Sequence, residues 1–374
     1  LEFYTMAKYR VLLVADQKEY VLSLVLTLAY IVNFTLTVIM IQLNSYIVLV
    51  RLVPLASFIL RAALLSWYVR RNYPFVKYNQ NADIDTNAKH LKRRWDALLM
   101  QLSVSMNTSA PVVILSIFCS LKIASVYGIY DLVFSGIISI LSIFTAGVSA
   151  SFGNLVANKE KETLEKAQNQ YEFFVFAICA FLYACALILI NPFISIYTQG
   201  VEDINYSNHL YGILFVVWGI LFNVRVPYTT LVNAGGLYRE TRWVNIQQML
   251  LLLGLALILV QYFELTGVLI ALIVSSIYWV IGLFSVIKKT ILNLSPLRSF
   301  GRVTRVFAIV LITYIPFIIG RQITAATLGE WFISALWVSV WCFFVTVSVN
   351  YLFDRKVMGE SIARVKMLIP GKGV

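Results

Sequence analysis

The sequence predicts an all-α protein that crosses a membrane many times, and three observations lead to that prediction. Hydrophobic residues make up 60% of the 374 residues and charged residues only 13%, whereas soluble domains are about a quarter charged. Apolar runs of roughly 20 residues, each able to cross a hydrocarbon core about 30 Å thick as a helix, recur along the chain. The weaker, alternating segments of about ten residues that build a membrane β-barrel are not visible.

Ten of these runs qualify as complete spans. In chain order they cover residues 20–43, 46–69, 97–121, 129–152, 171–191, 209–232, 244–263, 266–287, 303–321 and 331–353. The longest segment between spans, residues 70–96, contains the polar run NQNADIDTN, which indicates an exposed turn. We therefore expect a linker loop at 70–96 and the boundary between two helix bundles within it.

The segments between the spans alternate in charge, and this alternation predicts the orientation. One alternate set, which begins with residues 1–19 and ends with the tail after residue 353, carries 25 of the 30 basic residues, and the opposite set carries only Lys122 and Arg321. The positive-inside rule places the basic set, including the long loop and the C-terminus, in the cytoplasm. This bias explains most of the net charge of +12, so no nucleic-acid partner is expected.

Two arginines near the middle of spans are the first candidate functional residues. Arg61 lies about 5 Å and Arg225 about 7 Å from the centres of their spans, both toward the cytoplasm. A charge near the bilayer centre costs at least ~2.5–3.5 kcal/mol, and no acidic residue lies mid-span to pair with either. We predict that both face a water-filled cavity visited by an anion. The alternative is bonding to Asn107, Asn223 or a carbonyl freed by proline.

Other polar residues within the spans have open interpretations. Arg51 lies near the external end of its span, where it either snorkels to the surface or attracts the anion. Pro54, Pro111 and Pro227 can bend their helices, as in transporter pathways. Asp131 begins a polar face in span 129–152 that either packs against another helix or lines a lumen. Asp131 itself either caps its helix or binds a coupling cation.

No motif of catalysis or nucleotide binding is visible. The sequence has no GxxxxGK[ST] loop, and no carboxylate pair is placed for acid–base work on a sugar. The four cysteines all lie in apolar runs and there are only two histidines, so we expect neither a metal site nor a cofactor. These observations favour a transporter over an enzyme.

Three stretches of the sequence resemble one family. They are LLVADQKEY before the first span, VYGIYDLVFSGIISILSIFTAGVSASFGNLVANKEKE, and PYTTLVNAGGLYRETRWVNIQQMLLLLGLALILVQYFELTGVLIALIVSSI. The chain is similar over nearly its whole length to the polysaccharide transporter family, which includes the O-antigen and capsule repeat-unit flippases. This family belongs to the multidrug/oligosaccharidyl-lipid/polysaccharide exporter superfamily.

The resemblance implies a transporter of twelve to fourteen spans in two bundles around a central cavity, related by pseudo-twofold symmetry. On that plan residues 1–69 are the remnant of the first bundle, 97–287 form the second, and 288–374 add two further spans and a basic tail. The N-terminal spans would then be missing, which agrees with the absence of an initiator methionine.

The resemblance also implies a substrate and a location. Similar proteins flip undecaprenyl-diphosphate-linked oligosaccharides from the inner to the outer leaflet of the bacterial cytoplasmic membrane by alternating access, often driven by an ion gradient. Arginine suits a diphosphate because it offers bidentate, permanently charged contacts. Arg61, Arg225, Arg51, Asn107 and Asn223 are the predicted substrate-binding residues, and Asp131 is the predicted ion-coupling residue.

The expected partners are the lipid-linked substrate, membrane lipids and other proteins of polysaccharide assembly. Three alternatives stay open: another exporter of the same superfamily for lipid II or drugs, a membrane glycosyltransferase or polymerase, and a scaffold that transports nothing. Drug exporters take organic cations and would need buried acids rather than arginines, which makes that alternative the less favoured exporter.

Overall fold

The computed structural model describes residues 18–44, 46–74, 84–145, 148–201, 203–292, 295–319 and 325–359, together with single residues between Met6 and Asp16. The middle of the predicted linker, Arg321 and the end of the basic tail lie outside these ranges. All the regular structure described is helical, which confirms the predicted all-α membrane fold. Two compact units, Leu1–Asn87 and Ala88–Val374, divide the chain, and each is described by itself.

The first unit is a helical hairpin. Helix α3 (Glu19–Gln42) and helix α4 (Ile47–Asn72) pack along each other, and α4 contains Pro54. At one end of the hairpin a small apolar cluster is buried, formed by Met6, Leu13, Val21, Val25, Leu65, Val69 and Tyr73. Most other apolar side chains on both helices are exposed, as expected of helices that contact lipid on a wide face.

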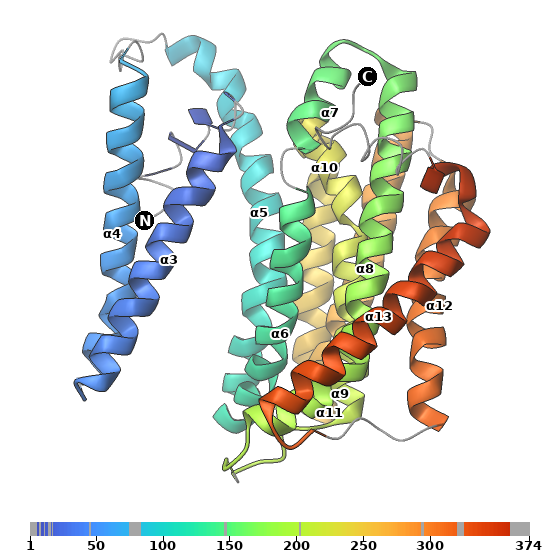
Figure 1. The fold of residues 1–374 in the computed structure, drawn as a ribbon. Helices are drawn as coiled ribbons and strands as arrows, with labels where there is room; N and C mark the ends of the chain where they lie inside the picture. Colours follow the sequence, from blue (N-terminus) through green and yellow to red (C-terminus); the bar gives the residue numbers. More distant parts are fainter. Residues whose placement is uncertain are drawn as a thin grey trace, which may run out of the picture. The chain divides into compact units, whose positions relative to one another are not determined.

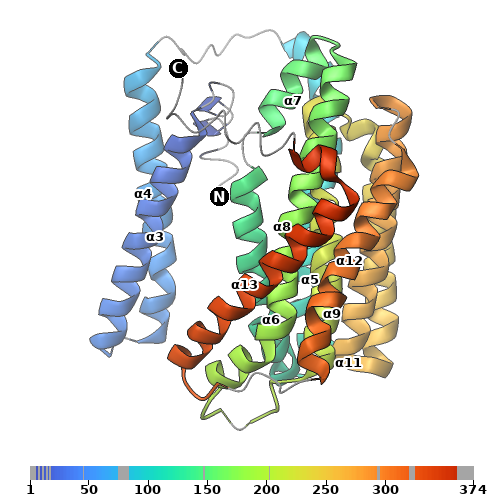
Figure 2. The same ribbon diagram turned by 45° about the vertical axis from the view of Figure 1, so that its right-hand side comes forward.

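The described residues of the second unit form nine further helices of ten residues or more, the first of which begins just before the unit does. They are α5 (Ile84–Phe118), α6 (Leu121–Thr145), α7 (Val148–Ala157), α8 (Lys161–Tyr197), α9 (His209–Val224), α10 (Val226–Gly235), α11 (Tyr238–Thr290), α12 (Pro296–Ile319) and α13 (Leu328–Phe353). The central helix is α8, which contacts α6, α9, α12 and α13, while α7 lies against α10 (Figures 1 and 2). The main apolar core surrounds α8 and includes Cys179, Tyr183 and Trp218.

Local signals in the sequence set several helix ends. The side chain of Asn208 accepts a hydrogen bond from the Leu210 N–H at the start of α9, and Thr327 does the same for Glu330 at the start of α13. Helix α10 ends at Gly236, whose φ of 61° is left-handed and suits glycine. Proline opens α12, where its missing N–H has no helical partner to lose.

Nine helices in the described part of the chain are long and apolar enough to cross a membrane. One of them, α11, has 53 residues, and at 1.5 Å per residue this is about 80 Å, far more than one bilayer. It is two spans joined at Glu264, whose φ of 46° and ψ of −125° reverse the chain. A Cβ at Gly267 would collide with the carbonyl of Leu259, so the two halves fold closely together. They correspond to the predicted spans 244–263 and 266–287.

Several boundaries differ from the predictions; helix α8, for example, begins at Lys161 rather than at residue 171, and α6 ends at Thr145 rather than at residue 152. Helix α6 begins at Leu121 rather than at residue 129, because the Ser120 hydroxyl accepts a hydrogen bond from the Ile123 N–H and the helix starts there. Helix α5 begins at Ile84, so the last part of the predicted loop 70–96 is helical. Helix α12 begins at Pro296 rather than at residue 303, so Arg302 lies on a helix instead of in a loop.

Candidate functional site

The site is organised by a break in one span. Helices α9 and α10 follow each other across Arg225, which belongs to neither, and Pro227 is the second residue of α10. Proline has no N–H to donate, so the helical hydrogen-bond ladder cannot run through this position. The Arg225 carbonyl accepts from the Tyr228 and Thr229 N–H groups and begins the ladder of α10. The break therefore fixes Arg225 near the middle of the 27-residue span His209–Gly235.

The Arg225 side chain is buried between aromatic rings. It is 7% exposed, and its guanidinium carbon lies 4.0 Å from the ring centroid of Phe222 and 4.3 Å from that of Trp279. No hydrogen bond or ion pair joins this guanidinium to any residue that the structure describes, and its buried Nε has no acceptor. Cation–π contacts contribute about 1–2 kcal/mol when desolvated, which offsets only part of the cost of burying the charge.

A chain of contacts leads from Arg225 to α5. The Trp279 indole N–H donates to Asn245 Oδ1 at 2.9 Å, and the Ser103 hydroxyl donates to the Asn245 carbonyl at 3.0 Å. One turn further along α5, Asn107 Nδ2 donates to the Ser103 carbonyl. We call Ser103, Asn107, Arg225, Asn245 and Trp279, together with Gln248 one turn after Asn245 on α11, the Arg225 cluster. It joins four spans of the second unit, because Asn245 and Trp279 stand on different halves of α11.

The Arg225 cluster contains several polar atoms without partners among the described residues. They are Asn107 Oδ1, Arg225 Nε, Asn245 Nδ2 and both side-chain atoms of Gln248. Asn107, Asn245 and Gln248 are completely buried. Each unsatisfied polar group of this kind costs about 1–3 kcal/mol. The cluster is thus a polar interior with unused donors and acceptors around one cation.

Asn223 lies elsewhere. Its Nδ2 donates to the Tyr183 hydroxyl at 2.7 Å and to the Gly219 carbonyl at 2.9 Å, so its amide faces α8. A Cβ at Gly219 would collide with the Tyr183 ring, which shows how closely the two helices approach. Of the two predicted asparagines, the structure links Asn107 to Arg225 through the cluster and commits Asn223 to Tyr183.

The two predicted arginines of the first unit are on α4. Arg61 is half-buried near the middle of that helix, and Arg51 lies four residues after its start at Ile47. The Arg51 side chain is outside the described part of the structure. Arg61 and Arg225 belong to different units, so the cavity they are expected to share stays a prediction.

Asp131 lies on α6, eleven positions into the helix, where it is half-buried. The capping alternative is therefore wrong, because α6 begins at Leu121. The Ser135 hydroxyl lies 3.5 Å from Asp131 Oδ2, and the hydroxyls of Ser139, Ser142 and Thr145 each bond a carbonyl of their own helix. Asp131 as an ion-coupling residue stays a prediction.

An ionic network is the feature that the sequence analysis missed. Arg302 of α12 is 3% exposed; it lies 3.6 Å from Glu172 Oε1 and 3.1 Å from Asp354 Oδ2, and it donates to the Asn169 carbonyl. Arg305 reaches the same Asp354 oxygen at 2.7 Å. Burial alone would raise the pKa of Asp354, but Arg305 and Arg302 outweigh it and hold that pKa below its ordinary value. We call Glu172, Arg302, Arg305 and Asp354 the ionic network.

A sequence signal for the ionic network exists. Arg302 and Arg305 are one helical turn apart at the edge of an apolar run, and single acids, Glu172 and Asp354, stand at the edges of two other runs. Placing Arg302 in the loop before the predicted span 303–321 hid this pattern. The network joins α8, α12 and the end of α13, with two positive and two negative groups in balance.

No family model, curated protein or solved structure matches the chain.

Proposed function

We propose that this chain translocates undecaprenyl-diphosphate-linked oligosaccharide repeat units across the bacterial cytoplasmic membrane. The observation that carries the proposal is the Arg225 guanidinium, buried at a helix break in mid-span, with no acidic partner among the described residues. Ionisable residues within membrane spans mark substrate or ion pathways when they do not pair with one another. A diphosphate headgroup supplies the negative charge that the Arg225 cluster lacks.

The geometry favours an anion with several oxygen acceptors. The Phe222 and Trp279 rings hold the guanidinium without using any of its five N–H donors. Arginine presents these donors in a planar fork that matches phosphate oxygens. The carbonyl end of α9 and the positive end of α10 meet at Arg225, so the two helix dipoles largely cancel there. Attraction for the anion therefore comes from the guanidinium itself.

The burial of Arg225 supports alternating access. At 7% exposure the guanidinium is covered in this conformation, so the headgroup binds in a second conformation that uncovers it. Arg61 and Arg51 supply further contacts from α4, Asn107 hydrogen-bonds the saccharide, and Asp131 couples the cycle to an ion gradient in this proposal. Asn223 contributes by holding α9 against Tyr183 of α8.

The rival exporters differ in the charge they require. A carrier of organic cations needs an available buried acid, but Glu172 lies beside Arg302 and Ser299. A lipid II exporter shares the diphosphate and differs only in the saccharide, so export assays with both lipids decide between them. For a glycosyltransferase or polymerase, the expected product is a longer saccharide instead of a relocated one.

The test is Arg225→Ala in the chromosomal gene. We expect loss of surface polysaccharide and accumulation of lipid-linked repeat units in the inner leaflet, with partial recovery by Arg225→Lys, because charge is kept while the planar fork is lost. Arg239→Ala, at an exposed position just after α10, is the matched control and should export normally. Normal export by Arg225→Ala, with the protein present in the membrane by immunoblot, would contradict the proposal.

A further inference from the structure

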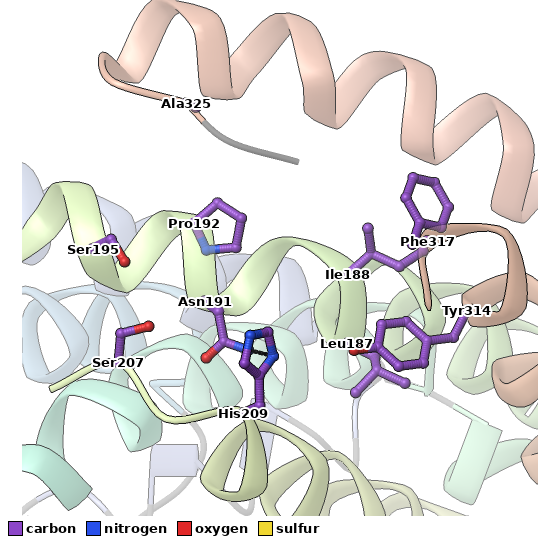
Figure 3. A pocket seen from close by; sticks show the side chains of 10 residues that line it. All are labelled: Leu187, Ile188, Asn191, Pro192, Ser195, Ser207, His209, Tyr314, Phe317 and Ala325. Atoms are coloured by element: carbon purple, nitrogen blue, oxygen red, sulfur yellow. Dashed lines mark hydrogen bonds between the residues drawn. The ribbon is translucent and has the colours of Figure 1, made fainter. Parts of the chain in front are cut away.

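A second polar site lies in the second unit, away from the Arg225 cluster. A pocket of about 260 Å³ opens between α8, the start of α9 and the end of α12 (Figure 3). It is lined by Leu187, Ile188, Asn191, Pro192, Ser195, Ser207, His209, Tyr314, Phe317 and Ala325. It lies on the side of the membrane that the distribution of basic residues predicts to be external. We call it the Asn191 pocket.

One buried side chain gives the Asn191 pocket unused hydrogen-bonding capacity. Asn191 is 8% exposed; its Nδ2 lies 2.9 Å from His209 Nδ1, and its buried Oδ1 has no partner among the described residues. When Asn191 donates to Nδ1, the neutral histidine carries its own proton on Nε2. The pair therefore offers one amide oxygen as an acceptor and one ring N–H as a donor.

The remaining lining residues make one end of the pocket polar and the other end aromatic. Ser195 and Ser207 add hydroxyl groups near Asn191 and His209, whereas Tyr314 and Phe317 place aromatic rings beside Leu187 and Ile188 (Figure 3). Pro192 has no N–H, so the carbonyl of Ile188 loses its helical partner and is a further acceptor. Among the described residues that line the pocket there is no aspartate, glutamate, lysine or arginine.

We propose that the Asn191 pocket binds one neutral sugar ring. A pyranose combines hydroxyl groups around its edge with apolar C–H faces, which matches hydroxyls and amides at one end and aromatic rings at the other. Pockets for drug-sized ligands span about 300–1,000 Å³, so this volume suits a single ring rather than a chain. None of the described lining residues is an aspartate, glutamate, lysine or arginine, which favours a neutral ring over an acidic or amino sugar. The inference rests on the proposed function only in taking the ring to belong to the exported saccharide.

The experiment measures binding of free glycosides to the whole chain in lipid nanodiscs by saturation-transfer NMR. The probes are methyl glucoside, methyl N-acetylglucosaminide, methyl glucuronide and methyl glucosaminide, with glycerol as a ringless polyol. We expect saturable binding of the first two, and at least tenfold weaker binding of the charged glycosides and of glycerol. If neither neutral glycoside binds saturably, the proposal is overturned. Equal binding of all probes also overturns it.

Variants locate the binding. Asn191→Leu and Tyr314→Leu should each weaken it about tenfold, and the milder Ser195→Ala about threefold, as expected for the loss of one hydrogen bond. Tyr197→Leu, on the same helix but outside the pocket and 55% exposed, is the matched control and should bind normally. Asn191→Asp should shift preference toward the amino glycoside, because it adds an anion. Unchanged binding in Ser195→Ala and Tyr314→Leu would place the sugar elsewhere and overturn the assignment.

The outcome is separable from that of the proposed function. Glycoside binding needs neither a diphosphate nor transport. If no neutral glycoside binds but Arg225→Ala loses export, the assignment of a sugar to the Asn191 pocket is wrong and the flippase proposal stands. If the neutral glycosides bind but Arg225→Ala exports normally, the sugar assignment stands and the flippase proposal is contradicted.

Discussion

Arg225 and Arg302 are buried to nearly the same degree in the same unit, yet their surroundings are opposite. Arg302, at 3% exposure, contacts two carboxylates and a backbone carbonyl. Arg225, at 7%, contacts two aromatic rings and no acceptor that the structure describes. Burying a charge is costly unless it is paired and hydrogen-bonded. The comparison teaches that one arginine is paired with acids of its own unit, whereas the other has no acceptor among the residues that the structure describes.

Removing Arg302 should have the largest effect on stability. Arg302→Ala leaves Glu172 without its cation and Asp354 with Arg305 alone, and breaking a buried pair from one side costs about 3–5 kcal/mol. Thermal unfolding of the purified protein in detergent measures the loss. Arg239→Ala, an exposed arginine on α11, serves as the control and should change little. A second variant that also carries Glu172→Leu should recover most of the stability, and no recovery would show that the pair is not the cause.

Removing Arg225 should raise the stability of the protein, in contrast to removing Arg302. Arg225→Met replaces an unpaired buried cation with an apolar side chain of similar length, so we expect stability to rise by about 1–2 kcal/mol after the lost cation–π contacts are counted. The same unfolding measurement applies, with Arg239→Met as the reference. Destabilisation comparable to that of Arg302→Ala would erase the distinction between the two arginines, because it would reveal a structural partner for Arg225.

The smallest expected effect is the pH dependence of the ionic network. The pKa of Asp354 is lowered in the folded protein, so its contribution is fully present above the unfolded value of about 3.9 and is lost as the pH falls through the lower folded value. Asp354→Asn should therefore lower stability by on the order of 1 kcal/mol near neutral pH and progressively less below pH ~4. Unfolding midpoints across pH test this, with Glu165→Gln as the exposed control. If the difference in unfolding midpoint between the wild-type protein and Asp354→Asn stays constant down to strongly acidic pH, the prediction is wrong.

The sequence was sufficient for the fold class and for the apolar runs, because a span must be long and apolar wherever it lies. It was insufficient at places where packing decides. Arg302 looked like a loop charge because the apolar run begins just after it, whereas the reversal at Glu264 falls between the predicted spans 244–263 and 266–287. Whether a cation is paired depends on residues far away in the chain, here Glu172 and Asp354.

For the candidate site, the position of Arg225 in its span was predictable and its neighbours were not. Pro227 predicts a break in the helix, so the sequence could place Arg225 next to that break. Trp279 and Phe222 read as ordinary apolar residues, and nothing in their spacing reveals that they stack on a guanidinium. Asn107 and Asn223 looked equivalent in sequence, but the direction of each side chain assigns one to the cluster and the other to Tyr183.

The reversal at Glu264 has a mechanical consequence. Because Gly267 lies directly against Leu259, the two halves of α11 have almost no slack between them at that end. A Cβ at Gly282 would likewise collide with Val244 near the opposite end, so we expect the two halves to move as one body. Asn245 and Trp279 stand on different halves of this hairpin and are joined by a hydrogen bond. We therefore expect these two residues of the Arg225 cluster to move together as part of one rigid hairpin.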